Sequence, residues 1–246
     1  MKVSFRLLAA AALCALPARA AWPQAQPPVP IDENSIEITE LGRSVVQSDV
    51  PPPGPPEPEL PVNIDQIINI AAKLWDVIQE NKAVVDVKPQ YAVAVPSGTI
   101  HWTQLSGWQP PKGVIYGFSA KNLYGAKVID VRYQVMRNYG GSYKGKGRYL
   151  SAVTIEPLSV QVAWGYKFSL SVDIPDSGIL NMGSQENPVA GMSVTLNWKI
   201  QALNASEGRA VYFLQGDGTF QEVGGPFRRR FADRLPGLLR APLRFP

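Results

Sequence analysis

The feature that most limits the fold of this chain is a repeated alternation of apolar and polar residues. Residues 166–174 (YKFSLSVDI) carry an aromatic or aliphatic residue at every second position, and residues 192–200 (MSVTLNWKI) do the same. Residues 128–136 and 158–164 follow the pattern as well. Successive side chains of a strand point to opposite faces, so this period of two predicts strands with one buried and one solvated face. Such strands are typical of antiparallel sheets.

Shorter runs extend the β pattern along most of the remaining chain. We expect further strands at 91–95, 99–105, 113–119, 149–155, 210–215 and 219–223. Turn signals such as NLYG at 122–125 and GDG at 216–218 separate these runs. The sequence therefore predicts a mainly β fold, an antiparallel β-sandwich or a barrel-like relative of one.

Residues 64–81 follow a different period. Asn63 and Gln66 form a capping-box pattern, and apolar residues then recur every three or four positions. This spacing predicts one N-terminal amphipathic helix that packs on the sheet. The alternative interpretation is that the helix contacts a membrane or a partner, with Trp75 in the interface.

The first twenty residues have the composition of a signal peptide. Lys2 and Arg6 precede an apolar stretch that is too short to span a bilayer, and Ala18-Arg19-Ala20 resembles a cleavage site. We expect cleavage after Ala20 and a secreted or periplasmic protein. The single cysteine, Cys14, lies in this segment, so the mature chain would be disulfide-free.

Composition divides the rest of the chain into three parts. Residues 21–62 contain 11 of the 23 prolines and seven acidic residues against one basic residue, which predicts an acidic, proline-rich arm or linker. Within the arm, residues 36–46 are apolar enough for a short strand. Residues 63–225 would form the helix-plus-sheet domain. Residues 226–246 form an arginine-rich tail with six arginines, either frayed or anchored on an anionic surface.

The sequence contains little that suggests catalysis. His101 is the only histidine, and a mature chain without cysteine offers no zinc site, so we expect no metal, no cofactor and no enzymatic activity. A hydrolase that uses paired carboxylates is the remaining catalytic alternative. Its candidate acids are Asp130, Glu156, Asp173 and Asp176.

One polar stretch, YGGSYKGKGRY at 139–149, raises the question of a binding site. We interpret it first as a hairpin tip whose cations protect a strand edge from unwanted pairing. The alternative is a loop that binds an anion, a sugar or a lipid head group. The candidate binding residues are Tyr139, Tyr143, Lys144, Lys146, Arg148 and Tyr149.

The tryptophans suggest a second, aromatic contact surface. Trp102 and Trp108 are candidates for membrane or partner contact together with Trp75, whereas Trp164 and Trp198 share the apolar face of their strands and are expected in the core. The expected function is therefore non-catalytic binding of a glycan, a lipid head group or another envelope component. Oligomerisation is compatible with this function, and no nucleic-acid partner is expected, because the basic charge is concentrated in the tail.

The layout of residues 64–136 resembles that of the actinoporin cytolysins. The shared features are an amphipathic helix followed by YAVAVPSGTIHWTQL (91–105), with its A-V-x-V strand, SG and W-T-x-L. The resemblance implies a secreted sandwich that forms pores by inserting its N-terminal helix into lipid. The long acidic arm departs from that family, and its aromatic lipid-head-group motif is not recognisable here.

Overall fold

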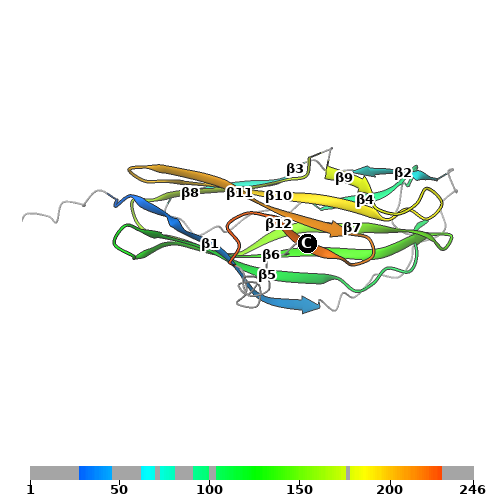
Figure 1. Ribbon diagram of the computed structural model, residues 1–246, viewed down its shortest axis with the longest axis horizontal. Helices are drawn as coiled ribbons and strands as arrows, with labels where there is room; N and C mark the ends of the chain where they lie inside the picture. Colours follow the sequence, from blue (N-terminus) through cyan, green and yellow to red (C-terminus); the bar gives the residue numbers. More distant parts are fainter. Residues whose placement is uncertain are drawn as a thin grey trace, which may run out of the picture.

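The computed structural model describes residues 28–45, 62–69, 73–80, 91–99, 104–175 and 178–228, which form two antiparallel sheets (Figure 1). Sheet A has the order β1 (Ile31–Val45), β5 (Lys112–Asn122), β6 (Lys127–Tyr143), β7 (Lys146–Val162), β4 (Ala92–Ser97) and β2 (Asn63–Asn69). Sheet B has the order β12 (Phe220–Gly224), β11 (Ala205–Gln215), β10 (Ala190–Gln201), β8 (Lys167–Asp173) and β3 (Lys73–Glu80). β9 (Ile179–Asn181) pairs with the start of β10. The mainly β, antiparallel class predicted from the alternation is confirmed.

The core lies between the two sheets. The ring of Phe118 in β5 packs against Phe168 in β8 and Trp198 in β10, with centroid distances of 5.5 and 5.4 Å. Along β8 and β10 every second side chain is buried, as the period of two predicts. Burying such aromatic and aliphatic surface is the main stabilising contribution to a fold of this kind.

The helix expected over residues 64–81 is absent from the described part of that segment. Residues 63–69 form β2 at the edge of sheet A beside β4, and residues 73–80 form β3 at the edge of sheet B beside β8. A lone amphipathic helix satisfies its own backbone but leaves the edges of β4 and β8 unpaired, whereas two strands pair with both edges. Isoleucines at 64, 67, 68 and 78 also favour strands. None of the described segments forms a helix with the length and apolarity needed to cross a bilayer.

Part of the proline-rich arm belongs to the sheet. Residues 31–45 form β1, which pairs with β5 along most of its length, so the strand suggested at 36–46 exists and begins earlier. Ile38 of β1 also forms a parallel bridge with Phe227, just after β12. The edge of sheet A is thereby joined to the end of sheet B.

Other boundaries differ from the expected ones. The strands predicted at 149–155 and 158–164 are one continuous strand, β7, in which Pro157 coincides with a register shift against β6. Of the predicted strand 99–105, the described residues Thr99, Gln104 and Leu105 lie in no strand, and the neighbouring Ser106 forms a single bridge with Ser142. The signal segment and residues 229–246 of the tail lie outside the described residues.

Candidate binding surface

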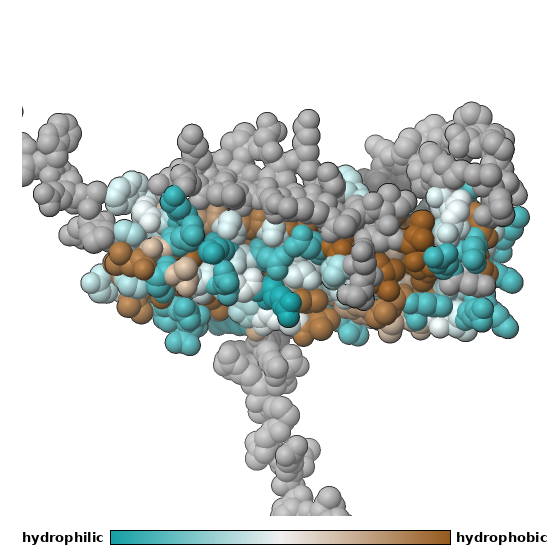
Figure 2. Space-filling view, turned by 90° about the horizontal axis from the view of Figure 1, so that it is seen from above, coloured by the Kyte–Doolittle hydropathy of each residue, from teal (hydrophilic) through white to brown (hydrophobic). Residues whose placement is uncertain are grey.

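Three turns at one end of the molecule carry large apolar side chains that face solvent. Leu123 and Tyr124 lie in the β5–β6 turn and are 62% and 85% exposed. Trp164 in the β7–β8 turn is 64% exposed, and Leu203 in the β10–β11 turn is 65% exposed. We call these four residues the apolar end. Figure 2 shows hydrophobic side chains at the left-hand end, where Figure 1 places the β5–β6 and β10–β11 turns.

The side chain of Asn122 fixes the first of these turns. Its Oδ1 accepts hydrogen bonds from the backbone N–H groups of Tyr124 and Ala126, at 3.1 and 3.0 Å. Asparagine commonly caps turns in this way. Asn122 is buried and holds the turn closed, and the two residues at the tip of the turn, Leu123 and Tyr124, are exposed.

Residues 28–31, which we call the strap, connect all three turns. The Leu123 N–H donates to the carbonyl of Pro30 at 3.0 Å, and the Tyr166 hydroxyl donates to the carbonyl of Val29 at 2.7 Å. The Asn204 amide forms two hydrogen bonds with the backbone of Ile31, at 2.8 and 3.3 Å. These contacts fix the turns relative to one another, so the apolar end is a preformed surface.

Lysines lie at the ends of the strands that join the turns of the apolar end. Lys121 and Lys127, at the two ends of the β5–β6 turn, are exposed, and so is Lys167 after the β7–β8 turn. Asp130 lies 3.1 Å from the Lys127 ammonium, and Asp32 is the register partner of Lys121. The charges next to the apolar end are therefore mixed in sign, with three exposed lysines at the ends of the adjoining strands.

The stretch 139–149 forms the β6–β7 connection, at the end of sheet A opposite the β5–β6 turn. Tyr143 pairs with Lys146, and Lys144 and Gly145 form a two-residue turn with φ values of 49° and 77°, so a hairpin is present as expected. The Lys144 ammonium lies 5.3 Å from the centroid of the Tyr143 ring, and Lys146 is exposed.

Edge protection, however, is the wrong explanation for these cations. β6 and β7 lie in the middle of sheet A, and Arg148 forms a bridge with Val189 beyond β7. Tyr149 is completely buried, with its hydroxyl 3.4 Å from the carbonyl of Ile64, so its side chain does not lie on the hairpin surface. Tyr139 is half-buried, with the Lys112 ammonium 4.7 Å above its ring.

The tryptophans divide differently from the expectation. Trp108 is half-buried against Gly141, and Trp198 lies in the core as predicted. Trp164 was expected in the core, but β7 ends at Val162, so Trp164 is carried outward by the turn. Trp102 and the side chain of Trp75 lie outside the described residues.

The candidate acids for a hydrolase are not brought together. Asp130 pairs with Lys127, Asp173 accepts a hydrogen bond from the Asn197 amide at 2.6 Å, and Glu156 accepts one from the Tyr91 hydroxyl at 3.3 Å. His101 and Asp176 lie outside the described residues. Across the ranges that the structure covers, no group of three or more His, Cys, Asp or Glu residues has the geometry for a metal ion.

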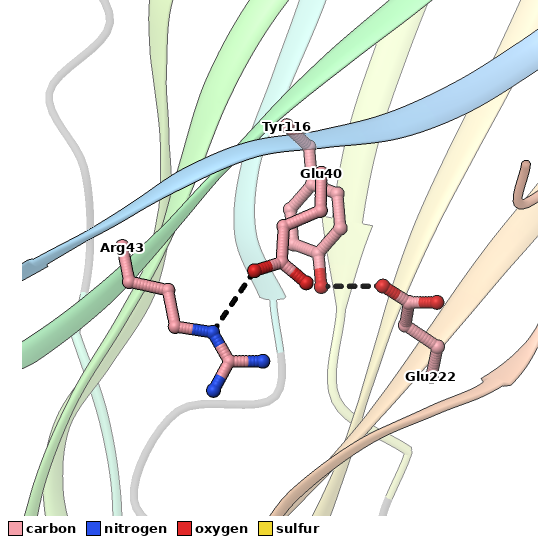
Figure 3. A network of polar contacts seen from close by, with 4 residues as sticks. All are labelled: Glu40, Arg43, Tyr116 and Glu222. Atoms are coloured by element: carbon pink, nitrogen blue, oxygen red, sulfur yellow. Dashed lines mark hydrogen bonds and ion pairs between the residues drawn. The ribbon is translucent and has the colours of Figure 1, made fainter. Parts of the chain in front are cut away.

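A different polar network lies where β1, β5 and β12 meet (Figure 3). The Tyr116 hydroxyl donates to Glu222 at 2.9 Å, and the Arg43 guanidinium pairs with Glu40 at 2.9 Å. Figure 3 shows the Glu40 carboxylate beside the Tyr116 hydroxyl. Burial, and then the hydrogen bond to Glu222, raise the pKa of Tyr116, so its hydroxyl stays protonated.

Two further tyrosines extend this network into the core. Tyr133 and Tyr212 share a hydrogen bond of 2.5 Å between their hydroxyls, and their rings contact that of Tyr116. Burial raises the pKa of both. We call Tyr116, Tyr133 and Tyr212 the tyrosine cluster. Its hydroxyls are neutral and engaged with one another or with Glu222, which makes this a structural feature of the core.

Sequence reasoning missed the apolar end as a surface. The available signal was a large apolar pair inside the turn motif NLYG, since turn tips usually carry small or polar residues. Comparisons with known protein families, with curated sequences and with solved structures found no match to this chain.

Proposed function

We propose that this protein is a secreted, non-catalytic binding protein that docks on a lipid surface through its apolar end. The observation that carries the proposal is the grouping of Leu123, Tyr124, Trp164 and Leu203 on three neighbouring turns, each at least 62% exposed. Exposed apolar groups that lie together on a fixed scaffold are typical of interaction sites. Tyrosine and tryptophan are the side chains that suit a boundary between water and hydrocarbon.

A lipid surface explains these side chains better than a glycan does. They lie on protruding turn tips, whereas a sugar site needs directed hydrogen-bond partners around its aromatic platform. Leu123 and Leu203 have no polar atoms in their side chains to supply such bonds. A fluid acyl and head-group layer can surround separate tips, and the lysines behind them can contact lipid phosphates.

Insertion of a helix formed by residues 64–81, as in the resemblance to the actinoporins, loses its basis. The described parts of that segment are strands β2 and β3, whose backbones pair with β4 and β8. Docking through preformed turns requires no such rearrangement. The proposed activity is therefore peripheral binding, with the sheets remaining folded.

Flotation with vesicles of phosphatidylcholine and phosphatidylglycerol tests the proposal. We expect the wild-type protein to float with the vesicles, and the variant Tyr124→Asp/Leu203→Asp to remain in the dense fraction. The matched control is Leu180→Asp/Met182→Asp, which changes two residues exposed to about half in and after β9. The proposal fails if wild-type protein does not float, or if the control and the test variant lose binding equally.

A further inference from the structure

Arg137 of β6 is buried at the end of the core with most of its guanidinium unpaired. Arg137 is 4% exposed, and its Nη2 donates a hydrogen bond to the carbonyl of Gly218 at 3.1 Å. The guanidinium carbon lies 4.8 Å from the centroid of the Phe220 ring. Nε and Nη1 are buried and have no hydrogen-bond partner. Two donor nitrogens of a permanently charged group are thus left unsatisfied.

The surroundings of Arg137 supply positive charge rather than a counter-ion. Lys112 is its register partner on β5, and Arg43 of β1 is close enough to act on it electrostatically. No carboxylate in the described ranges forms an ion pair with Arg137. Burial is the larger of the effects that lower the pKa of Arg137, and Arg43 adds to it. Nearly all buried donors in proteins are hydrogen-bonded, and buried charges are paired.

We propose that Arg137 binds a small oxyanion, either a carboxylate or a phosphate group. An oxyanion offers acceptor oxygens to the unpaired donors and neutralises the charge, and the planar guanidinium is well suited to both groups. Two of the groups that cover the guanidinium, Gly218 and Phe220, belong to the β11–β12 hairpin, and β12 is a five-residue strand at the edge of sheet B. The ligand would enter at this edge. The site is separate from the apolar end and does not depend on the proposed function.

Isothermal titration calorimetry with sodium phosphate and sodium acetate, at constant ionic strength set by sodium chloride, tests this site. We expect saturable binding of one of the two anions, at one ion per chain. The acetate and phosphate titrations distinguish the two ligand classes. Absence of saturable binding for both anions would overturn the proposal.

Variants assign the binding to Arg137. Arg137→Met keeps an unbranched apolar stem and removes the guanidinium donors, and we expect it to weaken anion binding by at least about tenfold. Lys146→Met is the matched control, because it removes one exposed cation from the β6–β7 hairpin and should leave binding unchanged. Equal binding by wild type and Arg137→Met would refute the assignment.

A measurement on the wild-type protein covers the case in which Arg137→Met does not fold. In nitrogen-15 spectra of the arginine Nε–H groups, addition of the bound anion should shift the Arg137 signal more than any other arginine signal. Arg137→Lys, which keeps the charge but loses the planar fork, serves to identify that signal. An Arg137 signal that stays in place while the anion binds would show that the ion binds elsewhere.

Discussion

Replacing Leu203 by alanine measures how much of the apolar end enters lipid. The change removes three carbon atoms, each worth about 0.8 kcal/mol on transfer out of water. Since Leu203 is 65% exposed, roughly 1.5 kcal/mol of that transfer remains available to a docking surface. A loss of this size lowers the vesicle partition coefficient about tenfold.

The assay is a titration with vesicles, followed by sedimentation and by tryptophan fluorescence. Trp164 is exposed, so its emission should shift to shorter wavelength on docking. Leu180→Ala is the control, since Leu180 is 50% exposed and pairs near the start of β10, at the opposite end of that strand from Leu203. Neither change should alter the unfolding temperature by more than a degree or two, because both side chains are exposed. A partition coefficient for Leu203→Ala equal to that of wild type would refute docking by this turn.

Four other predictions concern the strap and the core. Asn204→Ala leaves the Ile31 N–H unsatisfied and should cost about 1–3 kcal/mol in urea unfolding while also weakening vesicle binding; unchanged values for both would show that the strap does not organise the turns. Tyr133→Phe should destabilise the protein by a similar amount, because it leaves the buried Tyr212 hydroxyl without its partner. The double variant Tyr133→Phe/Tyr212→Phe should be nearly neutral, and a double-mutant cycle checks this. Above about pH 10 the unfolded chain releases protons that the tyrosine cluster keeps, so the contribution of the cluster to stability should be fully present below that pH and fall above it by about 1.4 kcal/mol per pH unit for each tyrosine, as urea unfolding at rising pH would measure. Gly216→Ala places a Cβ 2.0 Å from a backbone oxygen and should cost at least about 2 kcal/mol, against less than about 0.5 kcal/mol for Gly42→Ala, which has open space; equal melting temperatures would contradict the packing.

The alternation of side chains was sufficient to predict the central strands. In β8 the period of two correctly predicts that Phe168, Leu170 and Val172 are buried. The side chains of a strand alternate between its two faces, so these three lie on the same face, which packs on the core. The same pattern failed at residues 64–81. There the apolar spacing suits a helix, but without β2 and β3 one edge of β4 and one edge of β8 would have no partner, and this decides the outcome. The sequence of residues 64–81 alone contains no sign of those edges.

The apolar end was not predictable for a related reason. Trp164 continues the apolar alternation of residues 158–164, but β7 ends at Val162, and Leu158 on the same face is itself 50% exposed, so the alternation did not mark a buried face here. The contact between Ile31 and Asn204 joins residues 173 positions apart, with no local signal in either. Nothing in the sequence around Arg137 indicates that it is buried. Its guanidinium contacts the β11–β12 turn, which is distant in the sequence.

The bridge between Ile38 and Phe227 also affects when the protein can fold. It joins the first strand of the described domain to the residues that follow the last one. During synthesis this seam cannot close until residues 226–228 have left the ribosome, because its first half, at Ile38, is made long before its second. Contacts of such long range slow folding. The seam therefore closes late relative to the pairing of β1 with β5, and truncation before Pro226 would leave the edge of β1 uncovered at Ile38.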